Sequence, residues 1–152
     1  MTDFERIIVG IDGSEYSPAP LRLAGRLASA LGTRIEVITC LGFSDFYLPA
    51  HLPAGYIDSA AELEAIAKRL MEQAIERAFG DARPQHLSTT VRTGSPAKVL
   101  VEESKSAQLL VVGRRGRGGL LGQLMGSVSS ACVAHAHCPV LVVGQDPEEH
   151  GE

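Results

Sequence analysis

The segment "VVGRRGRGGLLGQLMGSVSS", Val111–Ser130, decides the fold, because it joins an apolar run to a helical segment through six glycines and three arginines. The run Leu109–Gly113 is short, apolar and partly β-branched, which favours a strand buried on both faces. The residues from Ser127 to Ala136 have helical character. A buried strand that leads through a loop into a helix is the unit from which parallel α/β sheets are built.

Strands and helices alternate along the rest of the chain. Short apolar runs predict strands at Arg6–Ile11, Arg34–Cys40, His86–Arg92, Leu109–Gly113 and Pro139–Gly144. Cap residues and helical spacing predict helices from Pro18 to Gly32 with Ser17 as N-cap, at Ser59–Phe79, after Ser95 and Pro96, and at Ser127–Ala136. The apolar residues expected to face the core are Leu21, Ala24, Ala28 and Leu31 in the first helix and Leu63, Ile66, Leu70 and Ile75 in the second. The predicted fold is a doubly wound five-stranded parallel sheet with helices on both faces, a Rossmann-like α/β sandwich.

Composition limits the classes of partner. The chain has 152 residues, 45% of them hydrophobic, which suits one domain with a sizeable core. Its formal net charge of -4 gives no overall electrostatic support for binding nucleic acid or an anionic membrane. Three cysteines without a Cys-x-x-Cys spacing, no signal-peptide pattern and no membrane-length apolar run lead us to expect a cytoplasmic protein with reduced thiols.

The glycine-rich segment has the chemistry of a phosphate cradle. Ligands of open parallel sheets bind outside the carboxyl ends of the strands, and this segment leaves the fourth strand there. Gly113 and Gly116 remove side chains where backbone N–H groups must face a ligand, and Gly126–Ser127 begins the next helix, whose free N–H groups attract anions. Positive charge is added locally by Arg114, Arg115 and Arg117.

Two familiar phosphate motifs do not match. A Walker A loop needs a Gly-Lys-Ser/Thr ending, and the chain has no lysine after Lys105. A dinucleotide fingerprint belongs in the first strand–helix unit, whereas Gly116–Gly118 lies late in the chain and is followed by Leu121 where the third glycine belongs. The sequence therefore argues against a P-loop and against a nicotinamide cofactor.

The spacing Gly113-x-x-Gly116, nine residues, then Gly126–Ser127 resembles the ATP-binding signature of the universal stress protein family. The opening "IIVGIDGSEYS" (residues 7–17), "GSPAKVL" (94–100) and "LLVVGRRGRGGLLGQLMGSVSSACVAHAHCPVLVV" (109–143) are similar to family segments in the same order. The resemblance covers nearly the whole chain except Leu41–Gly80. It implies one domain over residues 1–146, with an adenine nucleotide alpha hydrolase-like fold, followed by an acidic tail at 147–152 that we expect to be mobile.

The resemblance also implies a site. Asp12 would approach the ribose, Gly10 would leave room beneath the nucleotide, and the main chain of Cys40 would meet adenine. The residues implied for the phosphates are Gly113, Arg114, Gly116, Arg117, Gly126, Ser127 and Val128, with Ser129 a weaker candidate.

Plainer interpretations of these residues remain open. Asp12 to Ser14 can be a strand-to-helix turn, and the glycine run a surface loop. The arginines can be a solvated cluster or a nucleic-acid patch, although the chain has no Trp and only 5% aromatic residues for base stacking. His135, His137 and Cys138 fit a helix end better than a zinc site. We interpret Ser14, Ser17 and Ser95 as caps or turn residues, because no local motif pairs them with a base.

The function implied is an ATP-binding regulatory module in which nucleotide occupancy alters conformation or partner binding. Dedicated catalysis is not expected. The alternatives are a slow ATPase and a nucleotide-independent dimeric scaffold. We expect Mg²⁺ with the ATP, and a homodimer formed through the terminal strand, Pro139–Val143, because an apolar edge strand needs covering. The sequence identifies no protein partner and assigns no role to the loop Leu41–Asp58.

Overall fold

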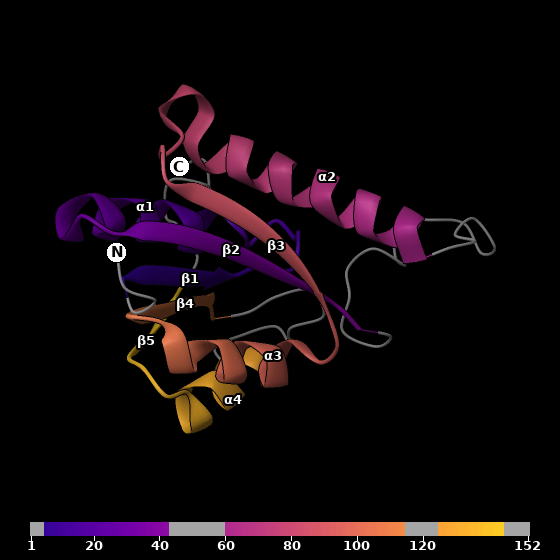
Figure 1. Ribbon diagram of the computed structural model, residues 1–152, viewed down its shortest axis with the longest axis vertical. Helices are drawn as coiled ribbons and strands as arrows, with labels where there is room; N and C mark the ends of the chain where they lie inside the picture. The colour runs from indigo at the N-terminus through magenta and orange to yellow at the C-terminus, as the bar shows by residue number, and fades with distance from the viewer. Residues whose placement is uncertain (1–4, 43–59, 115–124, 145–152) are drawn as a thin grey trace.

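The computed structural model describes residues 5–42, 60–114 and 125–144, and its elements match the predicted order (Figure 1). The strands are β1 (Arg6–Gly10), β2 (Arg34–Leu41), β3 (Leu87–Thr93), β4 (Leu109–Gly113) and β5 (Val140–Val143). The helices are α1 (Pro18–Leu31), α2 (Ala60–Phe79), α3 (Pro96–Glu103) and α4 (Ser127–His135), with short 3-10 turns η2 (Gly80–Ala82) and η3 (Ser104–Ser106).

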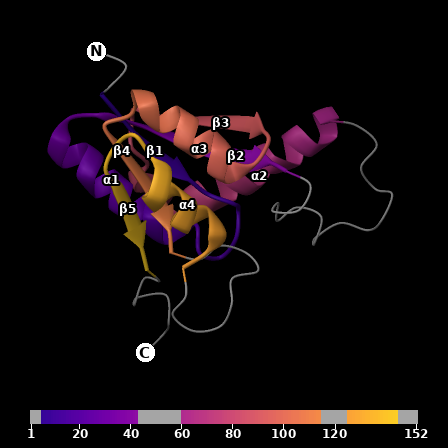
Figure 2. The same cartoon turned by 90° about the horizontal axis from the view of Figure 1, so that it is seen from below.

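The five strands form one parallel sheet in the order β3-β2-β1-β4-β5. Figure 1 shows α1 and α2 above the sheet and α3 and α4 below it, and Figure 2 shows α3 and α4 in front of the sheet when it is seen from below. The predicted doubly wound sandwich is therefore confirmed. β5 lies at the sheet edge, as the sequence predicted.

Alternate residues of each strand build two separate core layers, because side chains in a strand point to opposite faces in turn. Ile7 and Val9 pack with α1 and α2, whereas Ile8 packs in the opposite layer with Leu110 and Leu100. These side chains are almost completely buried. Burial on both faces explains why the central strands are nearly continuously apolar.

One charged side chain, Arg6, interrupts the lower layer and is itself buried. Its guanidinium contacts the Glu36 carboxylate at 2.6 Å and the Glu103 carboxylate at 2.9 Å, and it donates to the Ser106 hydroxyl at 2.7 Å. Two carboxylates and a hydroxyl therefore offset the desolvation of one cation. These contacts fix the end of α3 to the starts of β1 and β2.

The helix termini agree with the expected caps in position but not in every contact. Gly32 ends α1 with φ 67°, a conformation that favours glycine. Ser17 and Ser95 precede their helices, yet neither makes a side-chain cap hydrogen bond. Leu31 was wrongly expected in the core; it is the last residue of α1 and is 53% exposed, whereas Ala28 in the same turn is buried.

Some sequence expectations fall on residues outside the described ranges. They concern most of the loop Leu41–Asp58, the middle of the glycine-rich segment and the acidic tail 147–152. Within the described ranges, no helix has the length and apolar character required to cross a membrane.

Candidate functional site

The winding of the chain reverses between β1 and β4. From the central β1 the chain moves outward through β2 and β3, then returns to the other side of β1 to form β4 and β5. β1 and β4 are paired up to Gly10 and Val112, so their carboxyl ends lie at the same edge. Asp12 follows one of these strands and Arg114 the other. Ligands of doubly wound folds bind at such a reversal.

The main chain of Arg114 joins three elements at this edge. Its N–H donates to the Val143 carbonyl at 2.7 Å, and its carbonyl accepts the Gly126 N–H at 2.7 Å. The same carbonyl accepts the Ser129 hydroxyl at 3.0 Å. We call these three hydrogen bonds the Arg114 clamp. It fixes the end of β4 to the end of β5 and to the start of α4.

The amino terminus of α4 presents free donors. Its N-cap is Gly126, which has no side chain to cap the helix, and the first turn contains no acidic residue. The first N–H bonded within the helix is that of Ser130, which donates to the Gly126 carbonyl at 3.0 Å. The preceding N–H groups of Ser127, Val128 and Ser129 have no acceptor within the helix and carry its positive dipole end. Such a terminus attracts an anion.

Ser129 does not fit the phosphate role implied for it as a weaker candidate. It is buried, and its hydroxyl lies 3.0 Å from both the Arg114 and the Gly126 carbonyl oxygens. A hydroxyl has one proton to donate, and two main-chain acceptors share it here. The Ser129 side chain therefore connects the Arg114 and Gly126 main chains and is not free to donate to a phosphate.

Arg114 contributes an unsatisfied polar atom. Its Nε is buried and has no hydrogen-bond partner among the residues that the structure describes. An unpaired buried donor is costly, and a buried guanidinium donor pairs best with an anionic oxygen. The phosphate-binding prediction would supply such an oxygen.

Asp12 stabilises the turn between β1 and α1 and also lies where the winding of the sheet reverses. One oxygen, Oδ1, accepts the Ser14 N–H at 2.9 Å and the Ser17 hydroxyl at 3.4 Å. The plainer interpretation of Asp12 as a turn residue is thus correct for that oxygen. It also explains why the Ser17 hydroxyl is not free to cap α1.

Thr39 is a residue that sequence reasoning missed. Its buried hydroxyl donates to the Ile11 carbonyl at 3.0 Å, while the Ile11 N–H donates to the Ile38 carbonyl at 3.0 Å. These bonds carry the pairing with β2 one residue beyond the end of β1, so they fix the backbone just before Asp12. The signal was a lone hydroxyl within the apolar run Val37–Leu41.

The main chain of Cys40 faces the reversal. The N–H and C=O groups of successive residues point to opposite edges of a strand, so those of Cys40 point to the same edge as those of Ile38. Ile38 is paired with Gly10, the last residue of β1, so the main chain of Cys40 points toward the space beyond the end of β1. The thiol instead lies in the lower core layer, 6% exposed. Burial raises the pKa of Cys40 to about 12, so the thiol is neutral and only the main chain is offered to a ligand.

Gly10 has a packing reason of its own. A Cβ built on Gly10 would lie 2.6 Å from Leu100 Cδ1, so the space below this residue is filled by α3. Packing against α3 is therefore one reason for a glycine at this position, and its role beneath the nucleotide stays a prediction.

Gly116 and Arg117, also implied by the resemblance, lie outside the described residues. The histidines considered for zinc are described, and the N–H of His137 donates to the Ser104 hydroxyl at 2.9 Å. In residues 5–42, 60–114 and 125–144, no three His, Cys, Asp or Glu side chains converge into a group that could hold a metal.

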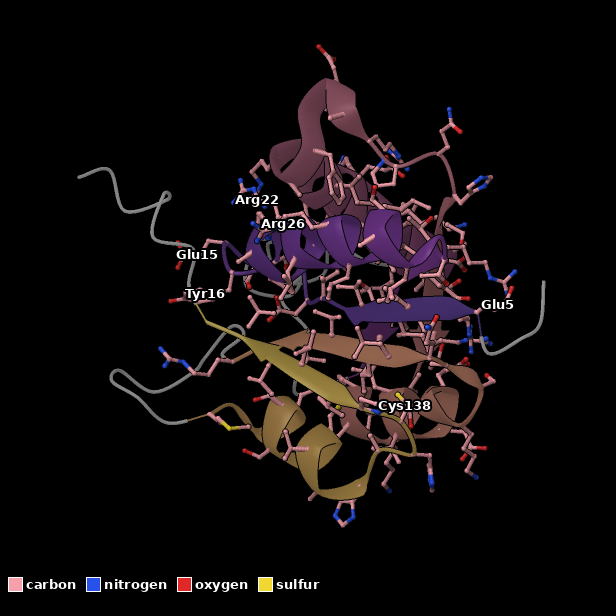
Figure 3. The ribbon with its side chains drawn as sticks, turned by 90° about the vertical axis from the view of Figure 1, so that its left-hand side faces the viewer. Glu5, Glu15, Tyr16, Arg22, Arg26 and Cys138 are labelled. Atoms are coloured by element: carbon pink, nitrogen blue, oxygen red, sulfur yellow. The ribbon has the colours of Figure 1, made fainter. Side chains whose placement is uncertain are left out.

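A separate open groove is lined by residues of α1, the start of β2 and the end of α2, among them Arg22, Arg26 and Arg34. Figure 3 shows Arg22 and Arg26 next to each other on α1. Arg22 donates to the Ala78 carbonyl at 3.3 Å and the Arg77 carbonyl at 3.1 Å, at the end of α2. Arg22 thus has a structural role, because it satisfies carbonyl groups at the carboxyl end of α2. The groove does not contain the strand ends at the reversal.

The fold and this edge define a class: a doubly wound α/β domain with an anion-attracting helix terminus at its winding reversal. The family model described as the universal stress protein family matches residues 3–144. The chain therefore belongs to the universal stress protein family.

Individual relatives agree with this assignment. A universal stress protein of Mycobacterium tuberculosis is 40% identical over 142 residues, which are 91% of this chain and 45% of the relative. The chain thus spans about half the length of the curated relatives it matches. A solved UspA from Lactobacillus plantarum has a TM-score of 0.70 and 25% identity and covers 92% of this chain and 97% of its own. A universal stress protein solved in complex with cAMP has a TM-score of 0.63 and 26% identity and covers 94% and 98%.

The cysteines provide a first test of this geometry. Burial raises the pKa of Cys132 to about 11, and it also raises the pKa of the less buried Cys138. Raised values mean that the reactive thiolate is scarce at pH 8 and increases as the pH rises toward the pKa. We expect iodoacetamide at pH 8 to label Cys138 first, and Cys40 and Cys132 only after unfolding. Mass spectrometry of the labelled peptides measures this, with Cys138→Ser as control; fast labelling of Cys40 would contradict its burial.

Proposed function

We propose that this universal stress protein domain binds an adenine nucleotide, with ATP as the expected ligand, at the reversal between β1 and β4. The observation that carries the proposal is the uncapped amino terminus of α4, which is bonded to the main chain of Arg114. The Nε of the same residue is buried and has no partner among the residues that the structure describes. Both features are donors that an anionic oxygen would satisfy. The site thus provides positive charge locally in a chain whose formal net charge is -4.

The described residues suit the phosphate end of such a ligand. The N–H groups of Ser127 and Val128 and the exposed Ser127 hydroxyl would donate to phosphate oxygens, with Gly113 and Gly126 allowing the phosphates to approach the backbone. Gly116 and Arg117 would complete the cradle. Because two arginines cannot neutralise a triphosphate, we expect Mg²⁺ to accompany ATP.

The nucleoside end would lie between β1 and β2. Asp12 would meet the ribose hydroxyls, and the main chain of Cys40 would meet the adenine ring. The related structure solved with cAMP, at 26% identity, supports an adenine nucleotide as the ligand class.

We propose a regulatory role for the bound nucleotide in the cytoplasm. Phosphoryl transfer needs a group that orients the attacking nucleophile. The phosphate-side segment 114–130 contains no carboxylate or histidine, and Asp12 is already engaged in its turn. The signal to a partner is then the binding of the nucleotide and not its hydrolysis.

We also propose a homodimer formed through β5. This strand is at the sheet edge, and the main-chain groups of Val140 and Val142 face outward, because Pro139 and Val143 accept hydrogen bonds from β4. An open apolar edge is normally covered. A second copy of β5, related by a two-fold axis, would satisfy these groups.

The first prediction of the proposal is nucleotide binding itself. Calorimetry should detect ATP binding, stronger with Mg²⁺, and ATP should raise the melting temperature. Gly113→Ala should weaken binding, because the added methyl obstructs phosphates near the backbone. The matched control is Gly144→Ala, at the end of β5, where an added Cβ meets nothing within 4 Å. No heat and no thermal shift with the wild type would refute the proposal.

The second prediction separates the ligand role of Asp12 from its turn role. Asp12→Asn keeps an oxygen for Ser14 and Ser17 but removes the charge that strengthens hydrogen bonds to ribose. We expect ATP affinity to fall about fivefold to tenfold, since hydrogen bonds to charged groups are stronger by roughly 1 kcal/mol. Glu15→Gln makes the same chemical change at an exposed neighbour and should leave affinity unchanged. Equal ATP affinity in both variants would mean that Asp12 stabilises the turn but does not bind the ribose.

The third prediction concerns the edge strand. A charge at Val142 would enter the core, because Val142 packs in the lower layer. Leu141 is 36% exposed on the same strand, so Leu141→Glu is the better variant. Light scattering should give a dimer mass for the wild type and for Leu31→Glu on α1, and a monomer mass for Leu141→Glu. A monomeric wild type at micromolar concentration would contradict the dimer.

A further inference from the structure

The Arg114 clamp connects the candidate phosphate site with the edge strand. We infer that nucleotide occupancy is transmitted from the start of α4 to the end of β5 through the main chain of Arg114, with Ser129 as the positioning residue. This inference rests on the proposed nucleotide site and adds its regulation.

The connection consists of one peptide segment with bonds on both sides. Toward the edge, the Arg114 N–H donates to Val143, the last residue of β5. Toward the site, the Arg114 carbonyl accepts from Gly126, the N-cap of α4, and from Ser129 in its first turn. One residue, Arg114, therefore connects the end of β5 to the start of α4 through hydrogen bonds.

Ser129 is the side chain that holds the clamp. It is 2% exposed, and its hydroxyl contacts carbonyl oxygens from both parts of the site, those of Arg114 and Gly126. Gly126 has no side chain, so its own part in the clamp is its main chain. The hydroxyl thus links the first turn of α4 to the residue that follows β4.

A bound phosphate would act on the same turn. Its oxygens would accept the N–H groups of Ser127 and Val128, which lie between Gly126 and Ser129. A ligand shifts an equilibrium only when it binds one arrangement better than another. Phosphate favours the arrangement in which this turn is formed and oriented, and in that arrangement both carbonyl bonds of Arg114 are made. Occupancy should therefore slow the opening of the β4–β5 end.

Hydrogen exchange can measure each bond of the clamp separately. The Arg114 amide reports the bond to β5, and the Gly126 amide reports the bond to α4. Their exchange is to be measured without ligand and with saturating Mg-ATP, in the wild type, Ser129→Ala and Ser130→Ala. Ser130 is the matched control, because it is the next residue, carries the same hydroxyl and is exposed.

We expect Mg-ATP to slow exchange of both amides about tenfold or more in the wild type and in Ser130→Ala. In Ser129→Ala the slowing at Arg114 should fall below about twofold, and ATP affinity should drop about fivefold, the effect of one hydrogen bond. A general loss of stability would also speed exchange at the central strands, whereas loss of the clamp should leave Val9 and Val37 unchanged. If Ser129→Ala does not fold, Ser129→Cys fills the space of the hydroxyl and replaces it by a weak donor.

The outcomes distinguish the two claims. Failure of the wild type to bind nucleotide overturns the proposed site and this inference with it. Binding by the wild type without slower exchange at Arg114 overturns the inference alone. Equal slowing at Arg114 in Ser129→Ala, Ser129→Cys and the wild type overturns the role of Ser129.

Discussion

The main-chain pairing of β1 with β2 on one side and β4 on the other is the constraint on which the site depends. It makes β1 the central strand and forces the chain to reverse its winding beside it. Asp12, Cys40 and Arg114, which are far apart in the sequence, consequently follow or end three neighbouring strands. The same strand pairing builds the core of the sandwich and leaves the carboxyl ends of β1 and β4 open for the candidate site.

The charge distribution is the second constraint. A chain with a formal net charge of -4 repels polyanions overall, so a phosphate site must rely on donors placed locally. The terminus of α4 and the guanidinium of Arg114 provide such donors, and the Arg114 clamp bonds the main chain of Arg114 to that terminus.

Much of this could be predicted from the sequence, since strand and helix boundaries follow local periodicity and caps. The spacing of Gly113, Gly126 and Ser127 predicted a phosphate site where β4 ends and α4 begins, and the structure does join these two ends. Phosphate binding there stays a prediction. The contacts of Thr39 and Ser129 could not be predicted, because each joins residues that only the tertiary fold brings together. The same holds for Gly10, whose space is occupied by Leu100 from α3, and for Val142, whose side chain faces the core.

The most direct test of the account is to locate the ligand by following backbone amide shifts in a magnetic resonance titration with Mg-ATP. The account predicts the largest shifts at Ser127, Val128 and Cys40, at the ends of elements that meet at the reversal. Shifts confined to the groove on α1, at Arg22 and Arg26, with the amides of Ser127 and Val128 unmoved, would contradict it.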